Sequence, residues 1–209
     1  MRLGYSVEIK GLEHVERLDG NVIFASNHVT ELDPLLIVAS LGFFSNKLPI
    51  IYVVDRKTIY QHKFKGWRKL CYGGLAFRII GGFEAYRGLR DYNKALRNHI
   101  GVLGDGASVC VFPVGRIHGA GDATSARGGV SYLANKTGLP VIPIHIQGIP
   151  RGIRLGDYLR RRPRLKITFG RPILASDLFK NSLGAGDESG SAQFNRASGE
   201  IMKAIYELG

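Results

Sequence analysis

Short apolar runs alternate with helical patterns along most of this 209-residue chain, and this alternation restricts the possible folds most strongly. The apolar runs are rich in β-branched and aromatic residues, and turn residues bound each of them, as is typical of strands. Strands alternating with helices predict an α/β domain with a mostly parallel central sheet flanked by helices. The predicted strands are residues 22–25, 50–54, 108–112, 141–146 and 165–169.

Helical patterns lie between these predicted strands. Asp33 and Pro34 predict the start of one helix, with Asp33 at the N-cap and Pro34 at the first helical position, and this helix ends near Gly42. Since no internal repeat occurs, we expect one domain over residues 1–209. Its core spans about 15–175, a flexible loop covers 181–191, and a C-terminal helix lies within 192–209. The other predicted helices are residues 90–103 and 125–137.

The net charge of +12 is large for a globular composition with 44% hydrophobic and 22% charged residues. Such an excess favours an anionic partner, whether nucleic acid, a membrane surface, or a phosphorylated or carrier-protein substrate. The chain contains no Walker A loop, no Gly-x-Ser-x-Gly elbow, and no Gly-x-Gly-x-x-Gly after a strand. The sequence therefore contains no motif that would indicate one of the common nucleotide-binding or serine-hydrolase sites.

A histidine and a carboxylate follow the first predicted strand within one turn. Asn27 and His28 come directly after the apolar run, and Asp33 lies five positions beyond His28. This spacing fits a general base and the acid that orients it. It equally fits a loop histidine that packs locally, with Asp33 acting only as a helix cap.

Three further segments are expected near strand ends, where α/β folds place their ligands. Arg87 and Gly88 follow a short strand-like piece at 81–86. Residues 111–117 end a buried strand in a turn that contains Pro113, Gly115 and Arg116. Residues 139–144 form an apolar strand interrupted by prolines.

The order of these four segments resembles the glycerolipid (lysophospholipid) acyltransferase superfamily, which includes 1-acylglycerol-3-phosphate acyltransferases. The matching pattern is Asn-His-x4-Asp, then Gly…Arg-Gly, then Phe-Pro-x-Gly, then Pro-Val-Ile-Pro, over about residues 15–150. Gly-Arg-Ile after Phe-Pro-x resembles the branch that reacylates lysophosphatidylethanolamine.

The resemblance implies an O-acyltransferase. His28 is then the general base that takes a proton from the acceptor hydroxyl, and Asp33 holds the imidazole, as in a Ser-His-Asp triad. The donor is a thioester, either acyl-CoA or acyl-carrier protein, and the acceptor is a lysophospholipid or 1-acylglycerol-3-phosphate. Neither a metal nor a cofactor is implied. The substrate-binding candidates are Asn27, Arg87, Gly88, Phe112, Pro113, Val114, Gly115 and Arg116.

Val114 departs from the family pattern, which usually has glutamate at this position. Loss of a charge-assisted hydrogen bond removes about 1.5–3 kcal/mol. The sequence therefore predicts that Val114→Glu raises turnover. An alternative is a degenerate homologue, or a basic lipid-binding module, without turnover.

Two basic segments suggest a surface-bound membrane protein. Residues 56–70 mix cations with aromatic side chains, and residues 160–164 carry four arginines. No segment reads as a signal peptide or a membrane-spanning helix, so we expect a peripheral protein on the cytoplasmic face of the membrane. Cys110 lies in an apolar run and Cys71 stands alone, which favours a reducing compartment. We find no nucleic-acid motif and expect no nucleic-acid partner.

Overall fold

The strands that the structure describes form one seven-stranded sheet. The computed structural model describes residues 7–55, 81–85, 91–115, 126–148, 164–180 and 190–209. The strand order is β1-β7-β6-β2-β5-β3-β4. The strands are β1 (Val7–Lys10), β2 (Ile23–Ser26), β3 (Ile50–Asp55), β4 (Gly82–Ala85), β5 (Ser108–Val111), β6 (Val141–Gln147) and β7 (Leu165–Phe169).

The sheet is mostly parallel, which confirms the predicted fold class. Strands β6, β2, β5, β3 and β4 all run in one direction. Only the β6–β7 pair is antiparallel among the described strands. Because five neighbouring strands are parallel, their carboxyl ends meet at one edge of the sheet, which we call the carboxyl edge.

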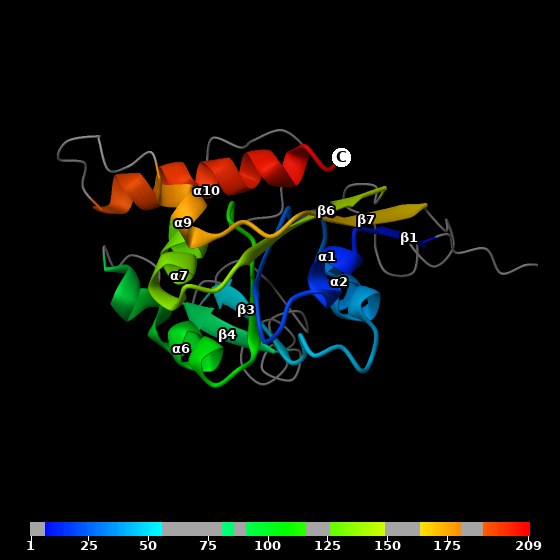
Figure 1. Ribbon diagram of the computed structural model, residues 1–209, viewed down its shortest axis with the longest axis horizontal. Helices are drawn as coiled ribbons and strands as arrows, with labels where there is room; N and C mark the ends of the chain where they lie inside the picture. The colour runs from blue at the N-terminus through cyan, green and yellow to red at the C-terminus, as the bar shows by residue number, and fades with distance from the viewer. Residues whose placement is uncertain (1–6, 56–80, 86–90, 116–125, 149–163, 181–189) are drawn as a thin grey trace, which may run out of the picture.

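Helices cover both faces of this sheet (Figure 1). On one face, α1 (Glu13–Glu16) and α2 (Asp33–Leu41) bury Val15 and Ile37 against Phe24 and Ile144. On the other face, α6 (Tyr92–Gly104), α7 (Gly129–Thr137) and α10 (Gly190–Tyr206) pack against β2, β5 and β6. A short helix, α9 (Ala175–Phe179), contacts α7 and α10. Strands β2 and β5 are wholly buried because both layers cover them.

The predicted strands all exist, and their bounds are within two residues of the prediction. Helix α10 begins at Gly190, two residues earlier than expected, and α7 begins at Gly129, four residues later. The sequence patterns did not reveal β1, α1 or α9. Every residue of β1 is exposed, so this edge strand lacks the apolar run that marks the central strands. Residues 181–189 of the predicted loop lie outside the described residues.

Within the described ranges, no helix combines the length and apolar character needed to cross a bilayer. Of the two basic segments expected to contact a membrane, 56–70 and 160–164, only Arg164 is among the described residues.

Candidate active site

Two turns lie next to each other at the carboxyl edge. The histidine turn, residues 27–33, follows β2, and the proline turn, residues 112–115, follows β5. Strands β2 and β5 are parallel neighbours, with Ala25 paired to Val111 just before the turns begin. The fold therefore brings together two of the four segments that the sequence singled out.

The histidine turn pairs His28 with Asp33 directly. Nδ1 of His28 lies 2.8 Å from Oδ2 of Asp33. The Asp33 side chain is fully buried, while 20% of the His28 side chain is exposed. Since Nδ1 faces the carboxylate, Nε2 is the nitrogen directed away from Asp33. The pair therefore has the geometry of a histidine base held by an acid.

The Asp33 carboxylate also closes the turn itself. Its Oδ2 accepts hydrogen bonds from the backbone N–H of Val29 at 2.6 Å and of Thr30 at 3.0 Å. The prediction that Asp33 caps α2 is wrong, because α2 begins at Asp33 and no side chain caps it. The carboxylate points back toward His28 and satisfies the turn rather than the helix end.

Thr30 is a site residue that the sequence reasoning missed. Its hydroxyl donates to Oδ1 of Asp33 at 3.0 Å, and its oxygen accepts from the N–H of Leu32 at 3.1 Å. Both oxygens of Asp33 therefore have partners, which fixes the plane of the carboxylate. The sequence signal was a hydroxyl two positions after the histidine and three before the acid, a spacing typical of local side-chain to backbone bonds.

Phe112 supports His28 from the neighbouring proline turn. The two rings are stacked, with centroids 4.2 Å apart and planes at 21°. Phe112 was expected to bind substrate, and its observed contact is with the imidazole. The contact with Asp33 limits movement of the imidazole within its plane, and the Phe112 ring covers one of its faces.

The proline turn takes its shape from backbone bonds. The N–H of Gly115 donates to the carbonyl of Phe112 at 2.8 Å, and the N–H of Arg127 donates to the carbonyl of Pro113 at 3.0 Å. Gly115 has a φ of 67°, a conformation that favours glycine. No side chain takes part in these two bonds.

Val114 points into the core rather than toward the site. Only 6% of it is exposed, and it belongs to the apolar cluster that includes Val111 and Val130. A glutamate in this orientation would bury a carboxylate among apolar side chains. The burial therefore predicts that Val114→Glu destabilises the protein, and its effect on turnover stays a prediction.

Asn27 uses its side chain to join β2 to β6. Its Nδ2 donates to the carbonyl of Ile146 at 2.7 Å, and its Oδ1 accepts from the N–H of Ile146 at 2.8 Å. This pair of bonds extends the strand pairing by one step beyond Ser26. These bonds position the start of the histidine turn, and substrate contact by Asn27 stays a prediction.

The arginine candidates are not among the residues that the structure describes. Arg87, Gly88 and Arg116 all fall outside it. Strand β4, which precedes Arg87, ends at Ala85 beside Asp55 of the parallel strand β3. The chain therefore leaves β4 at the same carboxyl edge that holds the histidine turn.

Cys110 is buried beneath the site. Burial, with a smaller contribution from Asp33, raises the pKa of its thiol. A buried neutral thiol is a poor nucleophile, which agrees with its predicted role as a small core residue. His28 and Asp33 are thus the described side chains with the best geometry for chemistry at this edge.

The fold resembles that of a solved acyltransferase. The crystal structure of the 1-acyl-sn-glycerophosphate acyltransferase PlsC from Thermotoga maritima superposes with a TM-score of 0.57. It covers 99% of this chain and 73% of that one, at 23% sequence identity. The acyltransferase family itself matches residues 6–147, more than half of the chain. This chain therefore belongs to the acyltransferase family.

Curated relatives carry a more specific name. The chain is 25% identical over 173 residues to the chloroplastic 1-acyl-sn-glycerol-3-phosphate acyltransferase LPAT1 of Arabidopsis thaliana, over 82% of this chain and 45% of that protein. It is 22% identical over 142 residues to the 1-acyl-sn-glycerol-3-phosphate acyltransferase of Borreliella burgdorferi, over 68% and 51%. The chain thus spans about half the length of the curated relatives it matches.

Proposed function

We propose that this protein transfers a fatty acyl group from a thioester to the hydroxyl of a 1-acylglycerol-3-phosphate or a related lysophospholipid. The observation that carries the proposal is the 2.8 Å contact between His28 Nδ1 and Asp33 Oδ2 at the carboxyl edge. Membership of the acyltransferase family and the names of the relatives support the reaction class.

In the proposed reaction, Nε2 of His28 removes the proton from the acceptor hydroxyl as its oxygen attacks the thioester carbonyl. The carbon–sulfur bond then breaks, and the thiolate leaving group takes up the proton. Asp33 keeps the Nδ1 proton directed away from the substrate and stabilises the imidazolium. The attacking group is the substrate's own hydroxyl, so the mechanism needs no protein serine.

The acceptor is proposed to carry a phosphate, which an arginine can bind with paired donors. Arg87 and Arg116 are the candidates from the sequence. The Gly115-Arg116 pair supports lysophosphatidylethanolamine as the first acceptor to compare with 1-acylglycerol-3-phosphate. The donor is acyl-CoA or acyl-carrier protein, and the net charge of +12 suits either anionic donor.

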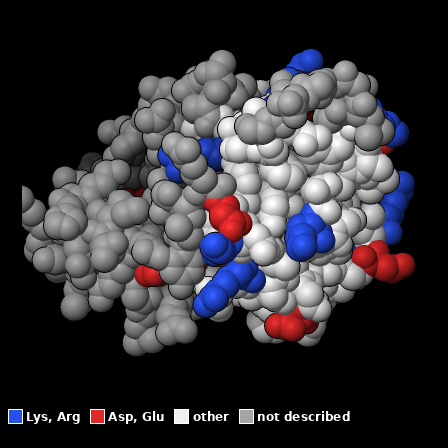
Figure 2. Space-filling view, turned by 90° about the vertical axis from the view of Figure 1, so that its left-hand side faces the viewer, with Lys and Arg blue, Asp and Glu red and all other residues white. Residues whose placement is uncertain are grey.

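We further propose that the protein works at a membrane surface, because its acceptors are lipids. Figure 2 shows one face, formed by α6, α7, α9 and the start of α10, on which the described cations are interspersed with acids. Two of these cations, Lys94 and Lys180, are paired with Asp91 and Asp177. The described part of this face therefore carries no concentrated basic patch that would favour it as the lipid-facing side.

A thioester-release assay tests the transfer reaction. Wild type and His28→Ala are compared with acyl-CoA and acyl-carrier protein donors against a panel of lysolipids. Loss of a general base should lower the rate by roughly 10²- to 10⁴-fold. Equal rates in the two proteins would remove His28 from the mechanism. No release by the wild type with any pair of substrates would favour the lipid-binding alternative.

A further inference from the structure

Helix α2 has an unusual outer face for a surface helix. Surface helices normally show polar side chains to solvent. Between Pro34 and Phe44, the only side chain with a polar group is Ser40, and it is buried with its hydroxyl bonded to the carbonyl of Leu36. The solvent side of α2 is therefore apolar along its whole length.

Large apolar side chains stand out from this face. Leu35 is 54% exposed, and Ala39 is exposed one turn further along. Phe43 and Phe44, directly after the helix, are 87% and 95% exposed. Their rings pack edge to face, with centroids 5.3 Å apart. We call Leu35, Ala39, Phe43 and Phe44 the α2 strip.

The Phe43–Phe44 end of the strip is held in place by the fold. The buried amine of Lys47 donates to the carbonyls of Leu18 and Gly20, which ties the segment after α2 to the turn before β2. The N–H of Ser45 bonds to the carbonyl of Gly42 at 3.3 Å. The two rings are therefore exposed on an anchored connection.

The α2 strip runs from the site to the opposite edge of the sheet. Helix α2 begins at Asp33, beside His28, and the segment after it is tied to residues that precede β2. A flat surface in contact with the strip would therefore lie alongside the histidine turn. The site would then be at the level of that surface rather than far above it.

The size of the strip argues against a protein partner. A nine-residue helix is about 14 Å long and about 10 Å wide with its side chains. Its outer face is thus well below the roughly 800 Å² per partner that stable protein interfaces bury. Inserted apolar and aromatic side chains are, by contrast, the usual contacts of helices that lie in a membrane interface.

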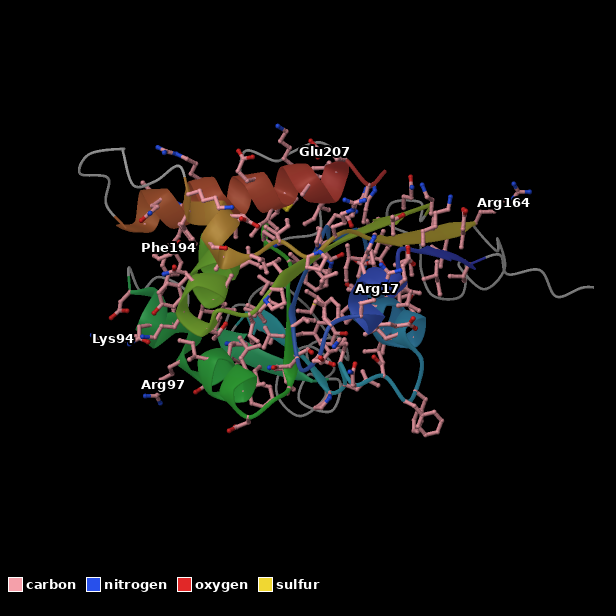
Figure 3. The ribbon with its side chains drawn as sticks, in the orientation of Figure 1. Arg17, Lys94, Arg97, Arg164, Phe194 and Glu207 are labelled. Atoms are coloured by element: carbon pink, nitrogen blue, oxygen red, sulfur yellow. The ribbon has the colours of Figure 1, made fainter. Side chains whose placement is uncertain are left out.

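The outer face of helix α6 differs from that of α2. Figure 3 places Lys94 and Arg97 on α6, at the left of the view, and Arg17, which follows α1, well to the right of them. Helix α6 therefore shows the charged outer face expected of a soluble protein. The chain's net charge of +12 adds long-range attraction to an anionic bilayer.

We propose that the α2 strip is the membrane-seating surface of this protein, with Phe43 and Phe44 inserted into the lipid interface and α2 lying along it. The seating proposal depends on the proposed function in one respect, namely that His28 must reach the hydroxyl of a lipid. The seating itself is a physical property of the folded chain.

Vesicle co-sedimentation tests the proposal without donor or acceptor. The wild type is compared with Phe43→Ser/Phe44→Ser on mixed phosphatidylcholine–phosphatidylglycerol vesicles. We expect the double variant to lose about tenfold or more in partition coefficient. The difference should persist at raised salt, since apolar insertion is not screened. Leu174→Ser, at a position 48% exposed near α9, is the matched control and should bind as the wild type does.

Three further measurements separate the outcomes. Unchanged circular dichroism melts show that the serine variants fold. His28→Ala should bind vesicles normally, so failure of acyl transfer and failure of seating are distinguishable. Equal partition of the wild type and the double variant would overturn the proposal. So would wild-type self-association that the double variant abolishes without any vesicle binding, which would assign the strip to a second copy of the chain.

Discussion

The two turns at the carboxyl edge hold their shapes by different means. In the histidine turn, side chains make the decisive bonds, since Asp33 accepts from His28, Val29 and Thr30. Replacing Asp33 therefore removes bonds to three neighbouring residues at once.

In the proline turn, the backbone makes the decisive bonds. Gly115 closes the turn through its N–H, and Pro113 is held through its carbonyl. The side chain at position 114 makes neither of these bonds, and it is buried in the core. The proline turn therefore depends on its backbone bonds, whereas the histidine turn depends on the carboxylate of Asp33.

The largest expected effect comes from Asp33→Asn. The amide cannot hold the Nδ1 proton of His28 as the carboxylate does, so we expect kcat to fall by about 10³- to 10⁴-fold. Steady-state kinetics at saturating acceptor measure it. Asp177→Asn, in the exposed pair with Lys180, is the matched control and should leave kcat unchanged. A loss of less than tenfold in Asp33→Asn would mean that the pair is structural.

Val114→Glu tests whether the side chain at position 114 of the proline turn must stay apolar. Because Val114 is buried among apolar residues, an unpaired carboxylate there should cost about 3–5 kcal/mol in the free energy of unfolding. Urea denaturation measures this, with Val7→Glu at an exposed strand position as the control. A stable and more active Val114→Glu protein would show that the side chain can turn toward the site.

A buried histidine outside the site, His99, makes the stability of the fold depend on pH. His99 is fully buried on α6, and burial lowers its pKa to about 4 despite a bond to the carbonyl of Phe83. The unfolded chain, with a pKa near 6.5 at this histidine, binds the proton more readily. Stability is therefore present above about pH 6.5 and is lost as the pH falls, by about 3 kcal/mol between pH 7 and pH 4.

Urea denaturation over that pH range measures the effect, and His99→Gln should flatten the dependence. An unchanged slope in the variant would assign the acid sensitivity to other groups. Activity profiles that are meant to report on the histidine turn should then be corrected for unfolding below pH 6.5.

The smallest expected effect comes from Thr30→Val. Loss of the hydroxyl leaves Oδ1 of Asp33 without its 3.0 Å partner. We expect a loss of about 1 kcal/mol in stability and up to about tenfold in kcat. Thr30→Ser keeps the hydroxyl and should restore both. If valine and serine behave alike, the plane of the carboxylate is set by the backbone donors alone.

Much of the fold could be predicted because apolar runs and breakers are local signals. Strands β2, β5 and β6 are buried on both faces, so their sequences are almost continuously apolar. Strand β1 and the short helices α1 and α9 carry no comparable pattern and were missed. Strand β7 runs antiparallel to β6, and the sequence of neither strand indicates this direction.

The sequence by itself determined the order of elements and the spacing of His28 and Asp33, because both depend on residues within a few positions of one another. Tertiary structure decided where side chains point. It placed Phe112 against the imidazole and directed Val114 into the core. These outcomes depend on neighbouring strands and on the space left by the packed layers, which no local pattern records.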